Sequence, residues 1–166
     1  PNNGIDDDGN GYVDDINGWN FVHENDNLED DNGHGTAVAS IIGSNTNNLN
    51  GMAGINGNCK LMILKISQAG TTSTIAITGA LKYAADNGAD VINISLAGPN
   101  YSQTIKPFIS IAQDAGAIIC AGSGNHNVDS VYYPATYSDV IVVGSPDPSV
   151  NRSKEWQLET GLGGSN

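Results

Sequence analysis

The fold class is decided by residues 91–121, which read VINISLAGPNYSQTIKPFISIAQDAGAIICA. Residues 91–96 form a short apolar run with the length of a strand. Residues 103–115 carry apolar side chains at helical spacing, and Gly116 marks the end of that helix. Residues 117–121 are a second apolar run. A strand, a helix and a strand in this order predict a right-handed crossover between parallel strands.

Strand-like segments continue on both sides of this unit. Residues 61–66 form a continuous apolar run, which is typical of a strand buried on both faces, and residues 140–143 are a further run with the length of a strand. Residues 1–33 are rich in Gly, Asn and Asp and are expected to be loops. The apolar pattern fades after Gly144, so residues 146–166 are expected to form a poorly specified tail.

Two further helices are expected, one before the strand at 61–66 and one after it. A short buried helix is predicted at residues 36–42, where Gly43 ends it. Residues 73–86 precede an Asn-Gly pair and carry one apolar face, formed by Ile75, Ile77, Leu81, Ala84 and Ala85. The sequence therefore predicts an α/β fold, with a parallel sheet that has helices on both faces.

Charge is distributed unevenly along the chain. The 166 residues include 18 acidic and 6 basic side chains and carry a formal net charge of −12. Residues 1–31 hold ten of the acidic side chains and no Lys or Arg. Nucleic acid is not an expected partner, because there is no basic patch to release its counterions. A membrane is not expected either, because no apolar run is long enough to span one.

The acidic segment contains a pattern of oxygen ligands at residues 6–15, which read DDDGNGYVDD. Calcium takes about six to eight oxygen ligands, and carboxylates this close together repel each other without a cation. The pattern predicts a Ca²⁺ site with side-chain ligands from Asp6, Asp8 and Asn10, the carbonyl of Tyr12, and Asp14 or Asp15. An EF-hand would have Glu where Asn17 stands, so a flanking helix pair is not implied. A solvated acidic turn is the alternative.

His34 lies between Gly33 and Gly35 at the start of a predicted helix. Glycine on both sides lets a substrate or another backbone approach the ring closely. An imidazole in this place is suited to accept a proton. Taken alone, the segment fits a loop histidine without a catalytic role equally well.

The segment Asp31-Asn32-Gly33-His34-Gly35-Thr36 closely resembles the histidine box of the subtilisin-like serine proteases, the subtilases. Further segments of this family are matched in the same order along residues 4–145. These are the segments Gly51-Met52-Ala53-Gly54, Val91-Ile92-Asn93-Ile94-Ser95-Leu96, Ala121-Gly122-Ser123-Gly124-Asn125 and Tyr133-Pro134-Ala135.

The resemblance implies roles for individual residues. His34 matches the general base, and Asn125 matches the amide that donates to the oxyanion of the tetrahedral intermediate. Two walls of a peptide-binding cleft are implied as well. The first wall is formed by Ser95, Leu96 and Ala97, and the second by Ala121, Gly122, Ser123 and Gly124. The small residues of the second wall suggest an open pocket that admits a large side chain of the substrate.

Two boxes of the family have no counterpart in this sequence. These are the upstream Asp-Ser/Thr-Gly box of the catalytic aspartate and the downstream Gly-Thr-Ser-Met-Ala box of the nucleophile. Asp31 is expected to cap the His34 helix instead of acting in catalysis. We therefore expect a fragment that is inactive by itself, because removing a triad member leaves little activity. In the family the missing aspartate strand lies between strands 61–66 and 91–96, so a complementary fragment or partner chain is expected to fill that position.

These observations predict an acidic calcium-binding loop region at 1–33, a partial subtilisin-like peptidase domain at 34–145 and a tail at 146–166. The function implied is part of a calcium-stabilised serine endopeptidase that acts on polypeptides outside the cell or in a vacuole. A non-catalytic calcium-binding or scaffold module derived from the same fold is the alternative. Cys59 and Cys120 allow one disulfide or two free thiols that pack as small apolar side chains.

Overall fold

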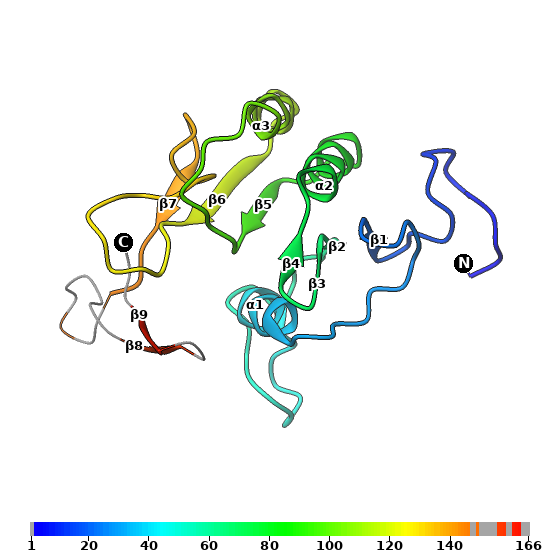
Figure 1. Ribbon diagram of the computed structural model, residues 1–166. Helices are drawn as coiled ribbons and strands as arrows, with labels where there is room; N and C mark the ends of the chain where they lie inside the picture. Colours follow the sequence, from blue (N-terminus) through cyan, green and yellow to red (C-terminus); the bar gives the residue numbers. More distant parts are fainter. Residues whose placement is uncertain (1, 147–148, 150–155, 159–160, 164–166) are drawn as a thin grey trace. The chain divides into compact units, whose positions relative to one another are not determined.

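The computed structural model describes residues 2–146, 149, 156–158 and 161–163. The chain forms two compact units, Pro1–Tyr83 and Ala84–Asn166. Both contain parallel strand pairs and helices, which confirms the expected α/β class (Figure 1). The division by function at residues 33 and 145 stays a prediction. Most of the expected tail lies outside the described residues, although β8 (Trp156–Leu158) and β9 (Gly161–Gly163) pair antiparallel.

The first unit is built on a short parallel pair of strands. β1 (Gly18–Asn20) pairs with β2 (Ile63–Lys65), and Gly18 lies opposite Ile63. Gly18 has φ +126°, and a Cβ atom added to it would lie 1.9 Å from the carbonyl oxygen of Ile63. Only glycine permits this approach. The sequence analysis placed residues 18–20 in a loop region, because a strand of three residues has no readable alternation.

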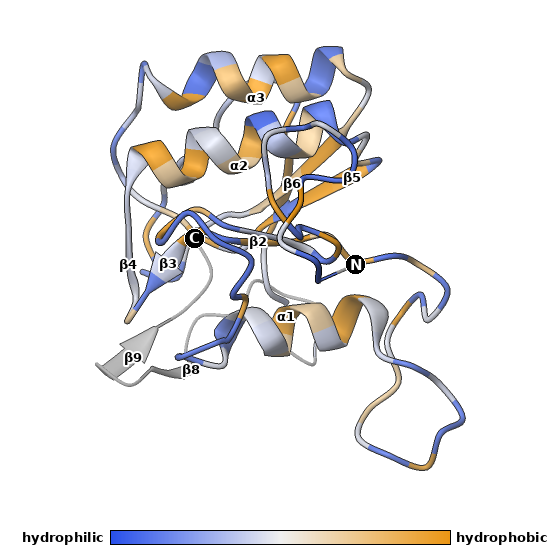
Figure 2. Cartoon of the chain, turned by 90° about the vertical axis from the view of Figure 1, so that its right-hand side faces the viewer, coloured by the Kyte–Doolittle hydropathy of each residue, from blue (hydrophilic) through white to orange (hydrophobic). Residues whose placement is uncertain are grey.

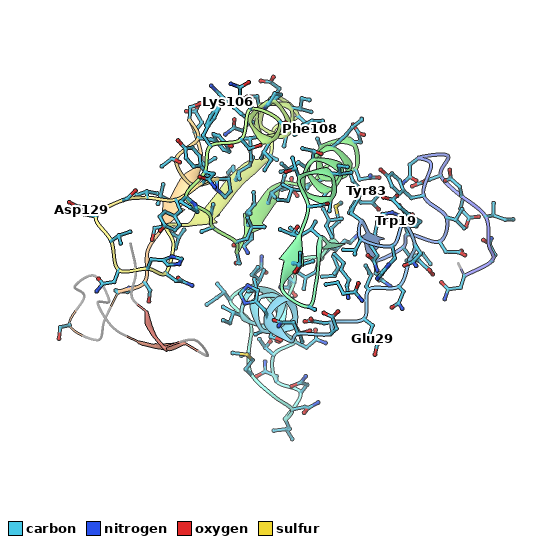
Figure 3. All side chains as sticks on the ribbon, in the orientation of Figure 1. Trp19, Glu29, Tyr83, Lys106, Phe108 and Asp129 are labelled. Carbon is cyan, nitrogen blue, oxygen red and sulfur yellow. The ribbon has the colours of Figure 1, made fainter. Side chains whose placement is uncertain are left out.

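A cluster of aromatic side chains forms the core of the first unit. Trp19 and Phe21 are buried against α2 (Thr74–Asp86), which contributes Ala76, Ala80 and Tyr83. Figure 3 labels Trp19 and Tyr83 at this place. The Tyr12 ring packs edge-on against both, with centroid distances of 5.1 Å to Trp19 and 4.9 Å to Tyr83. Residues from the acidic loop, from β1 and from α2 therefore share one core.

α2 confirms the helix expected at residues 73–86, with one difference in its buried face. The hydroxyl of Ser73 accepts the N–H of Ala76 at 3.1 Å, which caps the first turn. Ile75 was expected to point inward, but its side chain is 79% exposed. That expectation was wrong for Ile75, whereas Leu81 and Ala84 of the predicted face are buried. The core cluster of the first unit takes Ala76, Ala80 and Tyr83 from this helix.

Two other elements are less buried than expected. α1 (His34–Gly43) starts two residues before the expected helix, and none of its residues is buried. A loop lies against its end, where Ile55 and Asn56 donate N–H bonds of 2.9 Å to the carbonyls of Ile41 and Ile42. β2 was expected to be buried on both faces but is half-buried, because among the described residues it pairs only with β1. β3 (Ser67–Gln68) and β4 (Thr71–Thr72) form an unexpected short antiparallel hairpin.

The second unit contains the predicted strand–helix–strand segment. β5 (Val91–Ile94), β6 (Ile118–Gly122) and β7 (Ile141–Val143) form a parallel sheet in the order β5-β6-β7. The arrows of β5 and β6 are largely orange in Figure 2, as apolar strands require. α3 (Ile105–Asp114) connects β5 to β6 and confirms the expected helix, which has Pro107 in its first turn.

The two faces of this sheet differ in burial. Ile119 and Ala121 of β6 are buried on one face, and Ile109 and Ala112 of α3, which contacts β6, are buried too. On the other face Val91 is 59% exposed and its cross-strand neighbour Ile118 is 53% exposed. Within the described residues this second face is thus about half open to solvent. Cys59 and Cys120 are free thiols, and both are half-buried.

Tyr83→Phe is expected to destabilise the first unit. The Tyr83 hydroxyl donates a hydrogen bond of 2.5 Å to a carboxylate oxygen of Asp15. Removing this donor leaves a half-buried carboxylate with one partner fewer, which costs about 1–3 kcal/mol of the free energy of unfolding at pH 7. Urea unfolding followed by tryptophan fluorescence measures the loss. Tyr101→Phe is the control, because the Tyr101 ring is about half exposed.

The same pair makes stability depend on alkaline pH. Burial, and then the hydrogen bond to Asp15, raise the pKa of Tyr83 above its usual value. A raised pKa stabilises the fold below the unfolded-state value of about 10, and this contribution is lost as pH rises through the folded-state value. The stability difference between the wild type and Tyr83→Phe should therefore shrink above about pH 10. An unchanged difference at pH 7 and at pH 11 would contradict this account.

Candidate functional site

His34 is the first residue of α1, and its side chain is exposed. Gly33 precedes it with φ +86°, in the left-handed region, and the carbonyl of Gly33 accepts the N–H of Ala37 at 3.0 Å. The helix therefore begins at the histidine itself. The imidazole stands at the N-terminal end of the helix between two residues without side chains.

The carboxylate of Asp30 organises this segment. One of its oxygens accepts the N–H groups of Asn32 at 3.0 Å and Gly33 at 2.9 Å. The other accepts the N–H of Thr36 at 2.9 Å and the Thr36 hydroxyl at 2.7 Å. The Thr36 hydroxyl and then the backbone donors hold the pKa of Asp30 well below its usual value. A single carboxylate thus binds the backbone on both sides of His34.

The sequence analysis assigned this cap to Asp31, and that assignment was wrong. The Asp31 carboxylate lies 3.9 Å from the Lys65 ammonium instead. Lys65 also donates to the backbone carbonyl of Glu29. Two consecutive aspartates fit the cap pattern equally well in the sequence, and only the path of the loop decides between them.

The two predicted walls of a peptide-binding cleft come together in the second unit. β5 and β6 are adjacent parallel strands, and Ile94 lies opposite Ala121. The segments that follow them therefore leave the same edge of the sheet, where binding sites of α/β proteins lie. The two walls differ in exposure. In the first wall Ser95 and Ala97 are exposed and Leu96 is half-buried. The second wall is mostly buried, with Gly122 half-buried and the other residues buried: Ala121, Ser123 and Gly124.

Tyr133-Pro134-Ala135 was matched to the family from the sequence, but the connection that residues 132 and 133 make between the two walls was not predicted. Gly98 and Tyr133 exchange backbone hydrogen bonds of 2.9 and 2.8 Å, and the N–H of Tyr132 donates to the carbonyl of Ser123 at 3.0 Å. Tyr132 and Tyr133 thus connect the first wall with the second. Asn125 follows Gly124, which has φ +112°, and its side chain is exposed.

Tyr137 supports the chain just beyond the first wall. Its hydroxyl donates to the carbonyl of Ser102 and accepts the N–H of the same residue, both at 3.0 Å. Its ring lies 5.1 Å from the Tyr133 ring and 5.6 Å from the Tyr101 ring, measured between centroids. Burial raises the pKa of Tyr137 above its usual value.

Tyr137→Phe is expected to loosen residues 99–104 without unfolding the second unit. The substitution keeps the ring but removes both hydrogen bonds to Ser102, each worth about 1 kcal/mol. Amide exchange at Ser102, measured by NMR, should become at least about fivefold faster, as the loss of about 1 kcal/mol implies. Tyr133→Phe keeps its ring between Tyr101 and Tyr137 and serves as the control. Equal exchange rates at Ser102 in the two variants would contradict this role.

The acidic loop brings some of the predicted metal ligands together. The Asp6 carboxylate accepts the N–H groups of Gly9, Asn10 and Gly11 at 2.8, 3.1 and 2.8 Å. The Gly11 N–H contributes most to lowering the pKa of Asp6. The Asn10 amide donates to Asp8 at 3.2 Å and to Asp15 at 2.9 Å. Asp6, Asp8, Asn10 and Asp15 therefore meet around one turn.

The other two predicted ligands are placed differently. The Asp14 carboxylate accepts the N–H groups of Asn3 and Gly4, both at 2.8 Å, so it faces another segment. Tyr12 donates its N–H to the side-chain oxygen of Asn10 at 2.8 Å. Within the described residues no group of three or more Asp, Glu, His or Cys side chains is arranged to hold a metal. The oxygen donors suit Ca²⁺ in chemistry, whereas their carboxylates are held by backbone donors rather than gathered around one point.

The comparison that decides the family is a match of residues 2–157 to the model of the subtilase family, Peptidase_S8. The chain belongs to the subtilase family. It is 36% identical over 146 residues to an alkaline protease of Alkalihalobacillus alcalophilus, which covers 87% of this chain and 38% of that protein. It is 33% identical to thermitase of Thermoactinomyces vulgaris, covering 83% of this chain and 50% of that protein. A cell wall-associated protease of Bacillus subtilis (strain 168) is 40% identical over 77% of this subtilase chain and 14% of its own length.

Solved structures agree on the fold. The S41 psychrophilic protease superposes with a TM-score of 0.63 at 25% identity, covering 67% of this subtilase and 38% of that chain. The patellamide maturation protease PatA superposes with a TM-score of 0.64 at 25% identity, covering 71% of this chain and 45% of its own. This subtilase chain thus spans about half or less of the proteins named here.

In the residues that the structure describes, no helix combines the length and the apolarity needed to cross a bilayer.

Proposed function

We propose that this chain is part of a subtilisin-like serine endopeptidase that hydrolyses peptide bonds in polypeptides outside the cell or in a vacuole. The observation that carries the proposal is the family match over residues 2–157, within which His34 begins α1 between two glycines. The exposed imidazole is accessible to a nucleophile and to a bound substrate. The name of the cell wall-associated relative supports the location.

His34 is the general base of the proposed reaction. It takes the proton of a serine hydroxyl as that oxygen attacks the peptide carbonyl, and it passes the proton to the leaving amine. The sequence contains no counterpart of the nucleophile box or the aspartate box of the family. In the proposed enzyme the serine and the aspartate are supplied by a complementary fragment or partner chain.

The second unit supplies binding and oxyanion stabilisation. The exposed amide of Asn125 donates to the developing oxyanion, and loss of such a donor costs about 3–4 kcal/mol of transition-state stabilisation. An extended substrate binds between residues 95–97 and 121–124 and pairs with their backbone. The small residues at 121–124 leave room for a large side chain before the scissile bond.

The complementary fragment or partner chain that carries the aspartate strand pairs with the edge of β5. β5 is the terminal strand of its sheet among the described residues, and a terminal strand presents backbone groups that another strand can pair with. The open apolar face at Val91 and Ile118 is a second surface that additional chain would cover, because parallel sheets are normally covered on both faces.

The isolated 166-residue chain is expected to be inactive. It should neither hydrolyse a peptide substrate nor be labelled by a serine-directed phosphonate, because it lacks the nucleophile box. His34→Ala should be tested in a form of the protein that hydrolyses peptides, such as this chain combined with its complementary fragment. There it should reduce kcat by at least about a thousandfold. Both results are measured by active-site titration and steady-state kinetics.

His23→Ala is the matched control, because His23 is another exposed histidine of the first unit. Stoichiometric phosphonate labelling of the isolated chain would overturn the view that it lacks a nucleophile. If no form of the protein hydrolyses peptides, the alternative function, a non-catalytic module on the subtilase fold, replaces the proposal.

We also propose that Ca²⁺ stabilises the acidic loop, with Asp6, Asp8, Asn10, the Tyr12 carbonyl and Asp15 as ligands. The support is the set of hydrogen bonds that links four of these residues in one turn, together with their hard oxygen donors. Asp15 suits the closing position better than Asp14, because the carboxylate of Asp14 binds the N–H groups of Asn3 and Gly4.

Calcium is expected to raise the Tm of the chain, and Asp8→Asn should abolish this shift. Asp8 is the variant of choice, because its carboxylate accepts fewer backbone donors than that of Asp6 and its loss disturbs the turn less. Asp7→Asn removes the same charge one position away and should keep the shift. Calorimetric titration with Ca²⁺ that gives neither heat nor a thermal shift would contradict the calcium site.

A further inference from the structure

The segment that carries His34 has little conformational restraint of its own. Gly33 and Gly35 flank the histidine, and glycine has more backbone freedom than any other residue. Gly33 occupies the N-cap position of α1, so the helix has no cap from the N-cap side chain. A general base in such a segment needs an external restraint, because a displacement of about 1 Å can cost about a hundredfold in rate.

Asp30 supplies this restraint from three residues before the N-cap. Its carboxylate accepts the N–H of Thr36, the third helical residue, which an N-cap side chain would normally bind. The same carboxylate accepts three further hydrogen bonds, from the Thr36 hydroxyl, the Gly33 N–H and the Asn32 N–H. A Cβ atom added to Gly35 would lie 3.6 Å from the same carboxylate, so Asp30 also lies beside the residue that follows His34.

Charge strengthens this arrangement. Hydrogen bonds to an ionised carboxylate are roughly twice as strong as neutral ones, and a negative charge is favourable at a helix N-terminus. The low pKa of Asp30 keeps the carboxylate ionised throughout the neutral range. The restraint is therefore present wherever a serine endopeptidase would work.

We propose that Asp30 is a positioning residue for His34: by binding the backbone at residues 32, 33 and 36, its carboxylate holds the imidazole in the orientation needed for proton transfer. The inference rests on the proposed peptidase function. Asp30 acts through the backbone that carries the base, because its hydrogen bonds go to residues 32, 33 and 36.

Asp31 provides a matched control within the same loop. It carries the same charge one position away, yet its carboxylate contacts the Lys65 side chain, 3.9 Å away. Asp31→Asn therefore changes the net charge as Asp30→Asn does, and it leaves the four hydrogen bonds of Asp30 in place. Asp30→Glu keeps the charge and moves it by one methylene group.

The first experiment uses the 166-residue chain and does not depend on catalysis. In Asp30→Asn one of the two acceptor oxygens becomes an NH₂ donor, so amide exchange at Gly33 or Thr36 should become at least about tenfold faster, as the loss of a charge-assisted bond implies. The NMR signals of His34 should broaden or split, which reports more than one orientation. Asp31→Asn should leave both observations unchanged. Unchanged exchange and a single sharp His34 signal in Asp30→Asn would overturn the proposal.

The second experiment uses the longest form of the protein that hydrolyses peptides. Asp30→Asn should lower kcat about tenfold to a hundredfold with KM within about twofold, because the base is displaced while the substrate walls are intact. Asp30→Glu should recover part of kcat, and Asp31→Asn should match the wild type. An unchanged kcat, or a change confined to KM, would overturn the positioning role.

The two experiments separate the inference from the function on which it rests. If the wild type hydrolyses no peptide in any form, the proposed function fails, and the exchange and His34 signals alone decide whether Asp30 holds the histidine. If the wild type is active and Asp30→Asn behaves like Asp31→Asn, the peptidase function stands and the inference about Asp30 is wrong.

Discussion

Parallel strand pairing is the constraint on which both units depend. Parallel neighbours cannot be joined by a tight turn, so β5 and β6 are separated by α3, and their carboxyl ends point to the same edge. That edge carries residues 95–97 and 121–125, which lie far apart in the sequence. In the first unit the pairing of β1 with β2 requires a glycine at position 18, where the two backbones nearly touch.

The acidic side chains of residues 1–31 serve mainly as local acceptors. Asp6, Asp14 and Asp30 each bind backbone N–H groups within their own loops, and Asp15 binds the hydroxyl of Tyr83. A loop rich in Gly and Asn has few regular hydrogen bonds, so carboxylates satisfy backbone donors that strands or helices would otherwise satisfy. The strong negative charge of this region is therefore tied to its loop structure.

Long, strongly periodic elements were predictable from the sequence, and short or exposed ones were not. α2, α3 and the strands β5, β6 and β7 lie where the apolar pattern placed them. The two helices and β6 bury apolar side chains, whereas all three residues of β7 are exposed in the part of the chain that the structure describes. β1 was missed because three residues are too few to show a period. Ile75 was misplaced because a helical stripe that drifts by one residue changes which side chain faces the core.

The candidate site also has features that the sequence predicted and features that it did not. The residue types at positions 34, 95–97 and 121–125 and their order along the chain identified the family and the roles proposed here. The tertiary structure decided which aspartate supports His34 and which tyrosines join the two walls. It also decided which acidic residues face Asn10. A sequence pattern reports burial and chemistry one position at a time. The partner of a carboxylate or of a backbone N–H depends on where the folded loop places both groups. Asp30 and Asp31 have the same side chain, and only their places in the loop give them different partners.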